Sequence, residues 1–146
     1  MKRVVVTGIG LISSIGNNLK STWNNLITGT SGVKKITNFD TEDLSCKIAG
    51  FISHDQSDKF YLNRNEYLSN REINRNDRFI QYGLIASEMA INDSNLQNVS
   101  EEIKNRIGVS VGSGIGGLET IYNGSITLNS RGPRKISPFF IPSSLI

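Results

Sequence analysis

The chain has one cysteine, Cys46, and one histidine, His54, the side chain types most often used in nucleophilic and acid–base catalysis. Cys46 lies in Leu-Ser-Cys-Lys-Ile-Ala, with no glycine turn and no clear helix start to activate its thiol, so we expect a buried, inert cysteine. His54 stands between Ser53 and Asp55, but adjacent residues rarely converge on one site. The sequence therefore favours a solvated loop histidine over a Ser-His-Asp triad.

A glycine-rich segment, 112–117, matches the letters of G-x-G-x-x-G, the loop that holds dinucleotide phosphates. A complete site also needs an acidic residue about 20 positions later, and no Asp or Glu follows Glu119. A second loop, Gly8 to Ser13, has serine where the third glycine belongs. Dinucleotide binding is therefore the least favoured function. No metal-ligand spacing is present, and we expect neither a metal nor a cofactor.

Two groups of cations could recognise an acidic partner. Arg71 and Arg75 are four residues apart and share a face if a helix begins early, and Arg134 is followed directly by Lys135. An ordinary solvated surface is the simpler interpretation of both groups. The formal net charge is +3, and the basic residues are dispersed without interleaved aromatics, so nucleic acid is not an expected partner.

The elements that must position these residues follow an α/β pattern. Lys2 to Thr7 predicts a first strand, and Arg106 to Val111 predicts a second that delivers the glycine loop. A long helical connection would make these two strands parallel. We expect a short strand within 46–52 between them.

Two helices are predicted from their apolar spacing. The first has Ser21 as its N-cap and ends at Gly29, and the second runs from an Asn76 N-cap to about Asp93. A short capped turn is expected at Ser100, and a helical continuation is expected beyond Leu118.

The composition is that of one soluble domain, with 37% hydrophobic and 20% charged residues. No apolar run is long enough to cross a bilayer, so we expect a cytoplasmic protein with no membrane partner. The chain stops at 142–146, which is typical of a helix beginning its first turn. We therefore expect the front part of a larger domain, truncated artificially or naturally.

Four separated segments, 4–10, 79–83, 111–118 and 132–143, together resemble the β-ketoacyl-acyl-carrier-protein synthases of bacterial fatty acid synthesis, most of all the type II synthases. The matches keep their order over essentially the whole chain. The resemblance implies a thiolase-like layered α-β-α-β-α fold, of which residues 1–146 would supply only the front part of the first half. It also implies a homodimer that condenses acyl-loaded with malonyl-loaded acyl carrier protein.

The resemblance also implies which residues matter. Ile115 matches the floor of the acyl-chain pocket, and Phe140 matches the aromatic that closes this pocket from the neighbouring subunit. Residues that match basic positions facing the carrier protein are Arg71, Arg75, Arg134 and Lys135. Asn74 stands where the family has a further cation, and this weakens the expected contact.

The catalytic cysteine elbow of the family would lie beyond Ile146, and both catalytic histidines would lie later still. Cys46 and His54 match none of them, so we expect this chain alone to be inactive. A non-catalytic module for carrier-protein binding or dimerisation is the alternative from a different functional class, and a dinucleotide-binding protein is the third.

Overall fold

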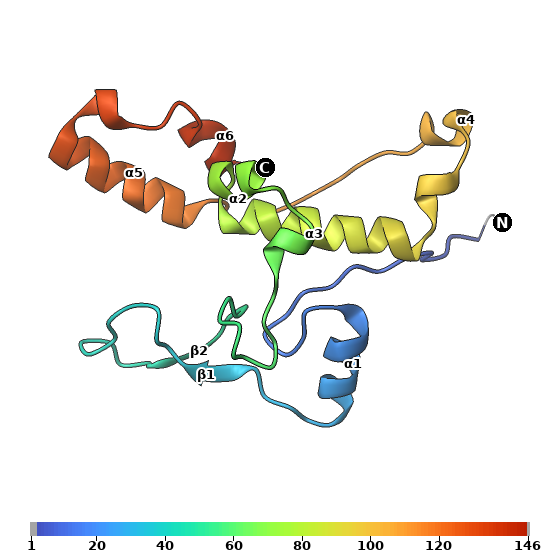
Figure 1. The fold of residues 1–146 in the computed structure, drawn as a ribbon, viewed down its shortest axis with the longest axis horizontal. Coiled ribbons are helices and arrows are strands. Elements are labelled where there is room, and N and C mark those ends of the chain that lie inside the picture. The colour runs from blue at the N-terminus through green and yellow to red at the C-terminus, as the bar shows by residue number, and fades with distance from the viewer. Residues whose placement is uncertain (1–2, 146) are drawn as a thin grey trace.

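The computed structural model describes residues 3–145, so Met1, Lys2 and Ile146 lie outside the described residues. Helices dominate the chain, and a single pair of short strands accompanies them (Figure 1). The helices and strands are α1 (Leu19–Ile27), β1 (Val33–Lys35), β2 (Ile48–Gly50), α2 (Asn70–Arg75), α3 (Arg78–Asp93), α4 (Glu101–Lys104), α5 (Leu118–Arg131) and α6 (Phe140–Ser144), with three short 3-10 helices, η1 (Arg64–Glu66), η2 (Leu96–Asn98) and η3 (Pro133–Lys135).

The 16-residue helix α3 is the longest helix and runs through the middle of the described chain (Figure 1). Its residue Ile85 is fully buried and forms the core with Leu62 and Leu68 from the loop that leads to α2. Tyr82 and Met89, on the same face of α3, pack against this core. The largest buried apolar cluster therefore lies between α3 and the 52–73 segment.

The two parallel strands expected at 2–7 and 106–111 are wrong for the described residues, which form no strand in either segment. Both segments are extended and open to solvent, with Val4 95% exposed and Val109 87% exposed. A strand exists only when a neighbour accepts and donates its backbone hydrogen bonds. Within residues 3–145 the only paired strands are β1 and β2, which are antiparallel with Val33 opposite Gly50.

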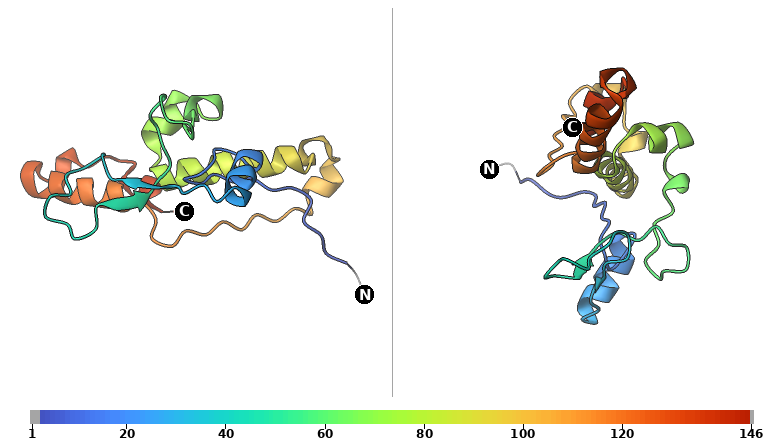
Figure 2. Two further views of the ribbon diagram at one scale, coloured as in Figure 1. Left: turned by 90° about the horizontal axis from the view of Figure 1, so that it is seen from below. Right: turned by 90° about the vertical axis from the view of Figure 1, so that its left-hand side faces the viewer.

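The N-terminal segment lies against α3 instead of in a sheet. The backbone N–H of Ile9 donates to Asp93 Oδ2 at 2.9 Å. Gly8 and Gly10 face α3 so closely that a Cβ on Gly10 would overlap the carbonyl oxygen of Ala86. The glycines after the first β-branched run therefore serve close packing of backbone on helix. Figure 2 shows residues 105–117 running back from α4 to α5 as a second extended segment.

Several predicted elements are confirmed. β2 lies within 46–52, a helix follows Leu118, and α4 begins after the N-cap Ser100. A short helix, α6, does lie near the C-terminal end of the described residues, but it begins two residues before Pro142 and ends at Ser144, with Leu145 extended, so the helix start expected at 142–146 was wrong in its bounds.

The predicted helix starts were wrong by one to three residues. Asn18, not Ser21, caps α1: its Oδ1 accepts from the Ser21 N–H at 2.9 Å, and Ser21 completes the capping box. Asp77, not Asn76, precedes α3. The sequence analysis also missed α2, since six residues are too few to show a helical period, although Ser69 and Glu72 form a capping box there.

Two glycine substitutions test the packing of the N-terminal segment. Gly10→Ala should lower the free energy of unfolding by about 1–3 kcal/mol, because the new methyl overlaps α3 backbone. Gly83→Ala, within α3 and facing open space, should instead raise it by about 0.5–1 kcal/mol through helix propensity. Urea denaturation followed by circular dichroism measures both. Equal effects of the two substitutions would contradict the observed contact.

Candidate functional site

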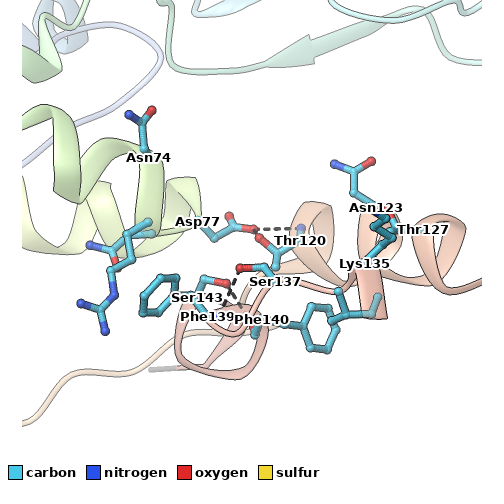
Figure 3. A pocket seen from close by; sticks show the side chains of 14 residues that line it. Asn74, Asp77, Thr120, Asn123, Thr127, Lys135, Ser137, Phe139, Phe140 and Ser143 are labelled. Carbon is cyan, nitrogen blue, oxygen red and sulfur yellow. Dashed lines mark hydrogen bonds between the residues drawn. The ribbon is translucent and has the colours of Figure 1, made fainter. Parts of the chain in front are cut away.

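Three separate segments of the chain meet in a polar cleft of about 340 Å³, which we call the α2–α6 cleft (Figure 3). They are the α2–α3 junction, one face of α5, and the segment from η3 to α6. The lining residues are Asn74, Arg75, Asn76, Asp77, Thr120, Asn123, Gly124, Thr127, Lys135, Ile136, Ser137, Phe139, Phe140 and Ser143. Amides, hydroxyls and two cations dominate this surface, with aromatic rings at one side.

Asp77 joins α3 to α5 at the base of the α2–α6 cleft. It is the N-cap residue of α3, but its side chain does not cap that helix. Its Oδ2 accepts hydrogen bonds from the backbone N–H of Thr120 at 3.0 Å and from Thr120 Oγ1 at 2.6 Å (Figure 3). Thr120 lies in the first turn of α5, where unpaired N–H groups and the helix dipole favour a carboxylate. Asp77 therefore caps the neighbouring helix.

The C-terminal end of α6 packs against the glycine residues that precede α5, next to the Asp77–Thr120 contact. The N–H of Gly117 donates to the Ser144 carbonyl at 3.0 Å, and a Cβ on Gly116 or Gly117 would collide with the Ser144 backbone. Within the glycine-rich segment 112–117, another part of the backbone comes close enough to exclude a side chain at these two positions. Gly112 and Gly114 have no atom near enough to require glycine.

Arg75 and Lys135 make the α2–α6 cleft cationic. The Arg75 guanidinium lies 4.2 Å from the centre of the Phe139 ring, a cation–π contact that holds the long side chain over the cleft. The carboxylate in the cleft, that of Asp77, accepts hydrogen bonds from Thr120 instead of pairing with Arg75. None of the described salt bridges includes Arg75, so its positive charge has no acidic partner there. The surface is suited to an acidic partner.

The structure brings together three of the six predicted site residues. Arg75, Lys135 and Phe140 all line the α2–α6 cleft. Arg71 and Arg134 are exposed on α2 and η3, the elements that carry Arg75 and Lys135, but they do not line it. Ile115 is 77% exposed on the loop before α5 and lies outside the cleft.

Sequence reasoning missed Asp77, Thr120 and Phe139 as parts of this site. Asp77 and Thr120 are 43 positions apart, so no local spacing links them. The contact between Phe139 and Arg75 likewise depends on α6 folding back towards α2, as Figure 1 shows. Only one sequence signal pointed to this contact: Thr120 lies in the first turn of a predicted helix, where backbone N–H groups lack intrahelical partners and need an acceptor.

Two sequence-based interpretations are corrected. Cys46 is exposed rather than buried, because it lies in the loop before β2, where its thiol contacts only the Ile48 carbonyl at 3.4 Å among the described hydrogen bonds. His54 is half-buried rather than solvated, since its ring stacks on Tyr82 of α3. Its Nε2 lies 2.7 Å from Tyr82 Oη, and its Nδ1 is buried without a partner in the described chain.

Within residues 3–145, no group of three acidic, histidine or cysteine side chains is arranged to hold a metal ion. None of the described helices is long and apolar enough to span a membrane.

Comparison with known proteins gives consistent matches. A family model for the N-terminal domain of β-ketoacyl synthases matches residues 1–145. The 3-oxoacyl-[acyl-carrier-protein] synthase 2 of Vibrio cholerae is 44% identical over 145 residues, which cover 99% of this chain and 33% of that protein. The enzyme of the same name from Staphylococcus aureus strain COL is 43% identical, with 97% of this chain and 32% of that protein covered.

Solved structures point in the same direction. The ishigamide ketosynthase/chain length factor superimposes with a TM-score of 0.72 at 25% identity, over 96% of this chain and 33% of that one. A ketosynthase bound to a hexaketide, in complex with its type II PKS acyl-carrier protein, gives a TM-score of 0.63 at 26% identity, over 99% and 36%. The chain thus spans about a third of the length of the curated relatives it matches.

The half-buried His54 predicts a pH dependence of stability. Burial, followed by the nearby Arg64 and Arg78 charges, lowers the pKa of His54 below its usual 6.5. The unfolded chain therefore binds a proton at His54 at higher pH than the folded chain does. The free energy of unfolding should fall as the pH drops below about 6.5 and level off below the folded-state pKa.

Urea denaturation between pH 5 and 8 measures this dependence. His54→Gln should flatten the profile in that range, because the substituted side chain does not titrate. Asp58 and Glu72, whose pKa values are lowered by hydrogen bonds from Lys34 and Ser69 respectively, act at more acidic pH. An unchanged slope in His54→Gln would show that another group causes it.

Proposed function

Because this chain belongs to the β-ketoacyl synthase family, we propose that it supplies the N-terminal portion of a 3-oxoacyl-acyl-carrier-protein synthase. The expected ketosynthase fold class is confirmed by the family model and by the superposition on a ketosynthase structure. Residues 1–146 would then form the first part of the synthase's thiolase-like domain.

The α2–α6 cleft is the observation that carries this proposal. Arg75 and Lys135 come from segments 60 positions apart, yet both line one surface, and Arg71 and Arg134 flank them on the same elements. Acyl carrier proteins are acidic, and a cationic surface would attract and orient them. A related ketosynthase has been captured with its acyl-carrier protein. We therefore assign carrier-protein docking to this cleft and its rim.

The reaction of the whole synthase would be a decarboxylative Claisen condensation. A cysteine thiolate first takes the acyl group from acyl carrier protein as a thioester. The malonyl group then loses CO2, and its C2 carbon forms a bond to the thioester carbonyl while the cysteine sulfur leaves. Neither Cys46 nor His54 matches the catalytic positions. This chain's share would be carrier docking and, through Ile115 and Phe140, part of the acyl pocket.

The proposal extends to the setting of the enzyme. We assign it to the cytoplasm, where fatty acid synthesis with a free acyl carrier protein takes place in bacteria. We also propose a homodimer, since the family pattern has Phe140 close the acyl pocket of the neighbouring subunit.

Charge reversal tests the docking surface. In the full-length protein that contains these residues, Arg75→Glu with Lys135→Glu should weaken binding of acyl carrier protein by roughly 10-fold or more at low salt. The deficit should shrink as salt rises, because screening removes the attraction from both proteins. Fluorescence anisotropy with labelled carrier protein measures the affinity.

The matched control is Arg106→Glu. Arg106 is exposed just after α4, which lies at the other end of α3 (Figure 1), and the substitution changes the charge equally per site. It should leave affinity nearly unchanged. If Arg106→Glu weakened binding as much as Arg75→Glu alone, net charge would be the cause and the α2–α6 cleft would not be the docking site.

Substitution at Ile115 tests the proposed acyl pocket. In the full-length protein that contains these residues, Ile115→Phe should reduce transfer of long acyl chains by roughly 10- to 100-fold while sparing short ones, because the larger ring fills the floor of the proposed pocket. Ile115→Ala should keep long-chain transfer. Acyl-enzyme formation followed by intact mass, with short and long acyl carrier proteins, separates these outcomes. Equal loss for both chain lengths would make Ile115 a purely structural residue.

A further inference from the structure

Gln81 is one of the most buried polar side chains in the molecule. It lies on the first turns of α3 and is 2% exposed. All of its hydrogen-bonding partners come from the segment before α3. Its Oε1 accepts from Arg64 Nη1 at 2.7 Å, and its Nε2 donates to the carbonyls of Ile73 at 3.0 Å and Asn76 at 2.7 Å. A buried amide with this many partners holds these groups in one geometry.

The two carbonyls belong to the C-terminal end of α2, where helix carbonyls lack intrahelical partners. They stand on either side of Asn74 and Arg75, the α2 residues that line the α2–α6 cleft. The N-terminal end of α2 is fixed separately by the capping box of Ser69 and Glu72. Gln81 therefore fixes the backbone at the Arg75 end of this helix.

The side chain of Arg75 is held by a different contact, its stacking over Phe139. Backbone and side chain are thus restrained by groups on two sides, Gln81 from α3 and Phe139 from the start of α6. Six residues make an isolated helix unstable in water, so α2 depends on such tertiary contacts for its position.

From these contacts we infer that Gln81 is a positioning residue, which sets the charge of Arg75 at the α2–α6 cleft for an acidic protein partner. The inference rests on the proposed carrier-protein docking. Gln81 is buried and touches no partner itself. Its effect passes through the α2 backbone, so the effect should disappear when Arg75 no longer carries its charge.

A double-mutant cycle tests this in the full-length protein. Gln81→Met keeps the side-chain volume but removes all three hydrogen bonds, and it should weaken binding of labelled acyl carrier protein about fivefold at low salt. The slope of affinity against salt should become shallower, while the fraction of binding-competent protein stays the same. In an Arg75→Glu background, Gln81→Met should cause no further loss.

Gln81→Glu is a second variant, so the test can proceed even if Gln81→Met does not fold. Its carboxylate can still accept from Arg64 but cannot donate to the Ile73 and Asn76 carbonyls, so it should weaken binding in the same manner. Thr22→Val is the matched control: Thr22 is equally a buried polar residue, and its hydroxyl bonds only to Ser13 among the described side chains. This control should leave both the affinity and the salt slope unchanged.

The outcomes are distinguishable. If Arg75→Glu weakens binding but neither Gln81 variant does, or if the Gln81 effect persists undiminished in the Arg75→Glu background, the positioning role is overturned and the docking proposal stands. If the wild-type protein shows no salt-dependent binding of carrier protein, the proposed function fails and the inference fails with it.

Discussion

The hydrogen bonds that Asp77 accepts from Thr120 hold the two halves of the described chain together. Asp77 follows α2 and precedes α3, and Thr120 opens α5, so one carboxylate oxygen ties the core-forming part to the C-terminal part. The contact is favourable for a general reason: the first turn of a helix offers unpaired N–H groups and a positive dipole end. Together with the Arg78–Glu119 ion pair and the stacking of Arg75 on Phe139, this contact sets α5 and the start of α6 beside the α2–α3 junction, where the α2–α6 cleft lies.

A second constraint shapes the molecule: its buried apolar surface is small. Only Phe60, Leu62, Leu68 and Ile85 are buried hydrophobic residues among those described, while many large apolar side chains remain exposed. The exposed residues include both β-branched segments, 4–6 and 109–111. Relatives that match nearly all of this chain are about three times as long. In such proteins, further chain is available to pair with these segments.

The candidate site was partly predictable. The type and spacing of Arg71, Arg75, Arg134 and Lys135 marked them as cations that could face an acidic partner, and the family resemblance predicted carrier-protein docking for them. Spacing could not indicate which of them share a surface, because the distance between α2 and η3 is set by α5 and α6. The sequence also predicted the wrong burial for Cys46, which is exposed, and for His54, which stacks on Tyr82. The burial of a loop residue depends on what packs against it, and that contact is not encoded in the local sequence.

The sequence by itself determined the local features and the family. Helices α1, α3 and α5 follow from apolar spacing, which acts within a few positions, and ordered motifs along the whole chain indicated a β-ketoacyl synthase. Only the tertiary structure decided which residues meet. Chain folding brings three pairs of groups into contact. Gln81 donates to carbonyls at the end of α2, Asp77 accepts from Thr120, and Arg75 stacks on Phe139. Strand formation was likewise decided by tertiary contacts, because a β-branched run becomes a strand only where a neighbouring strand completes its backbone hydrogen bonds.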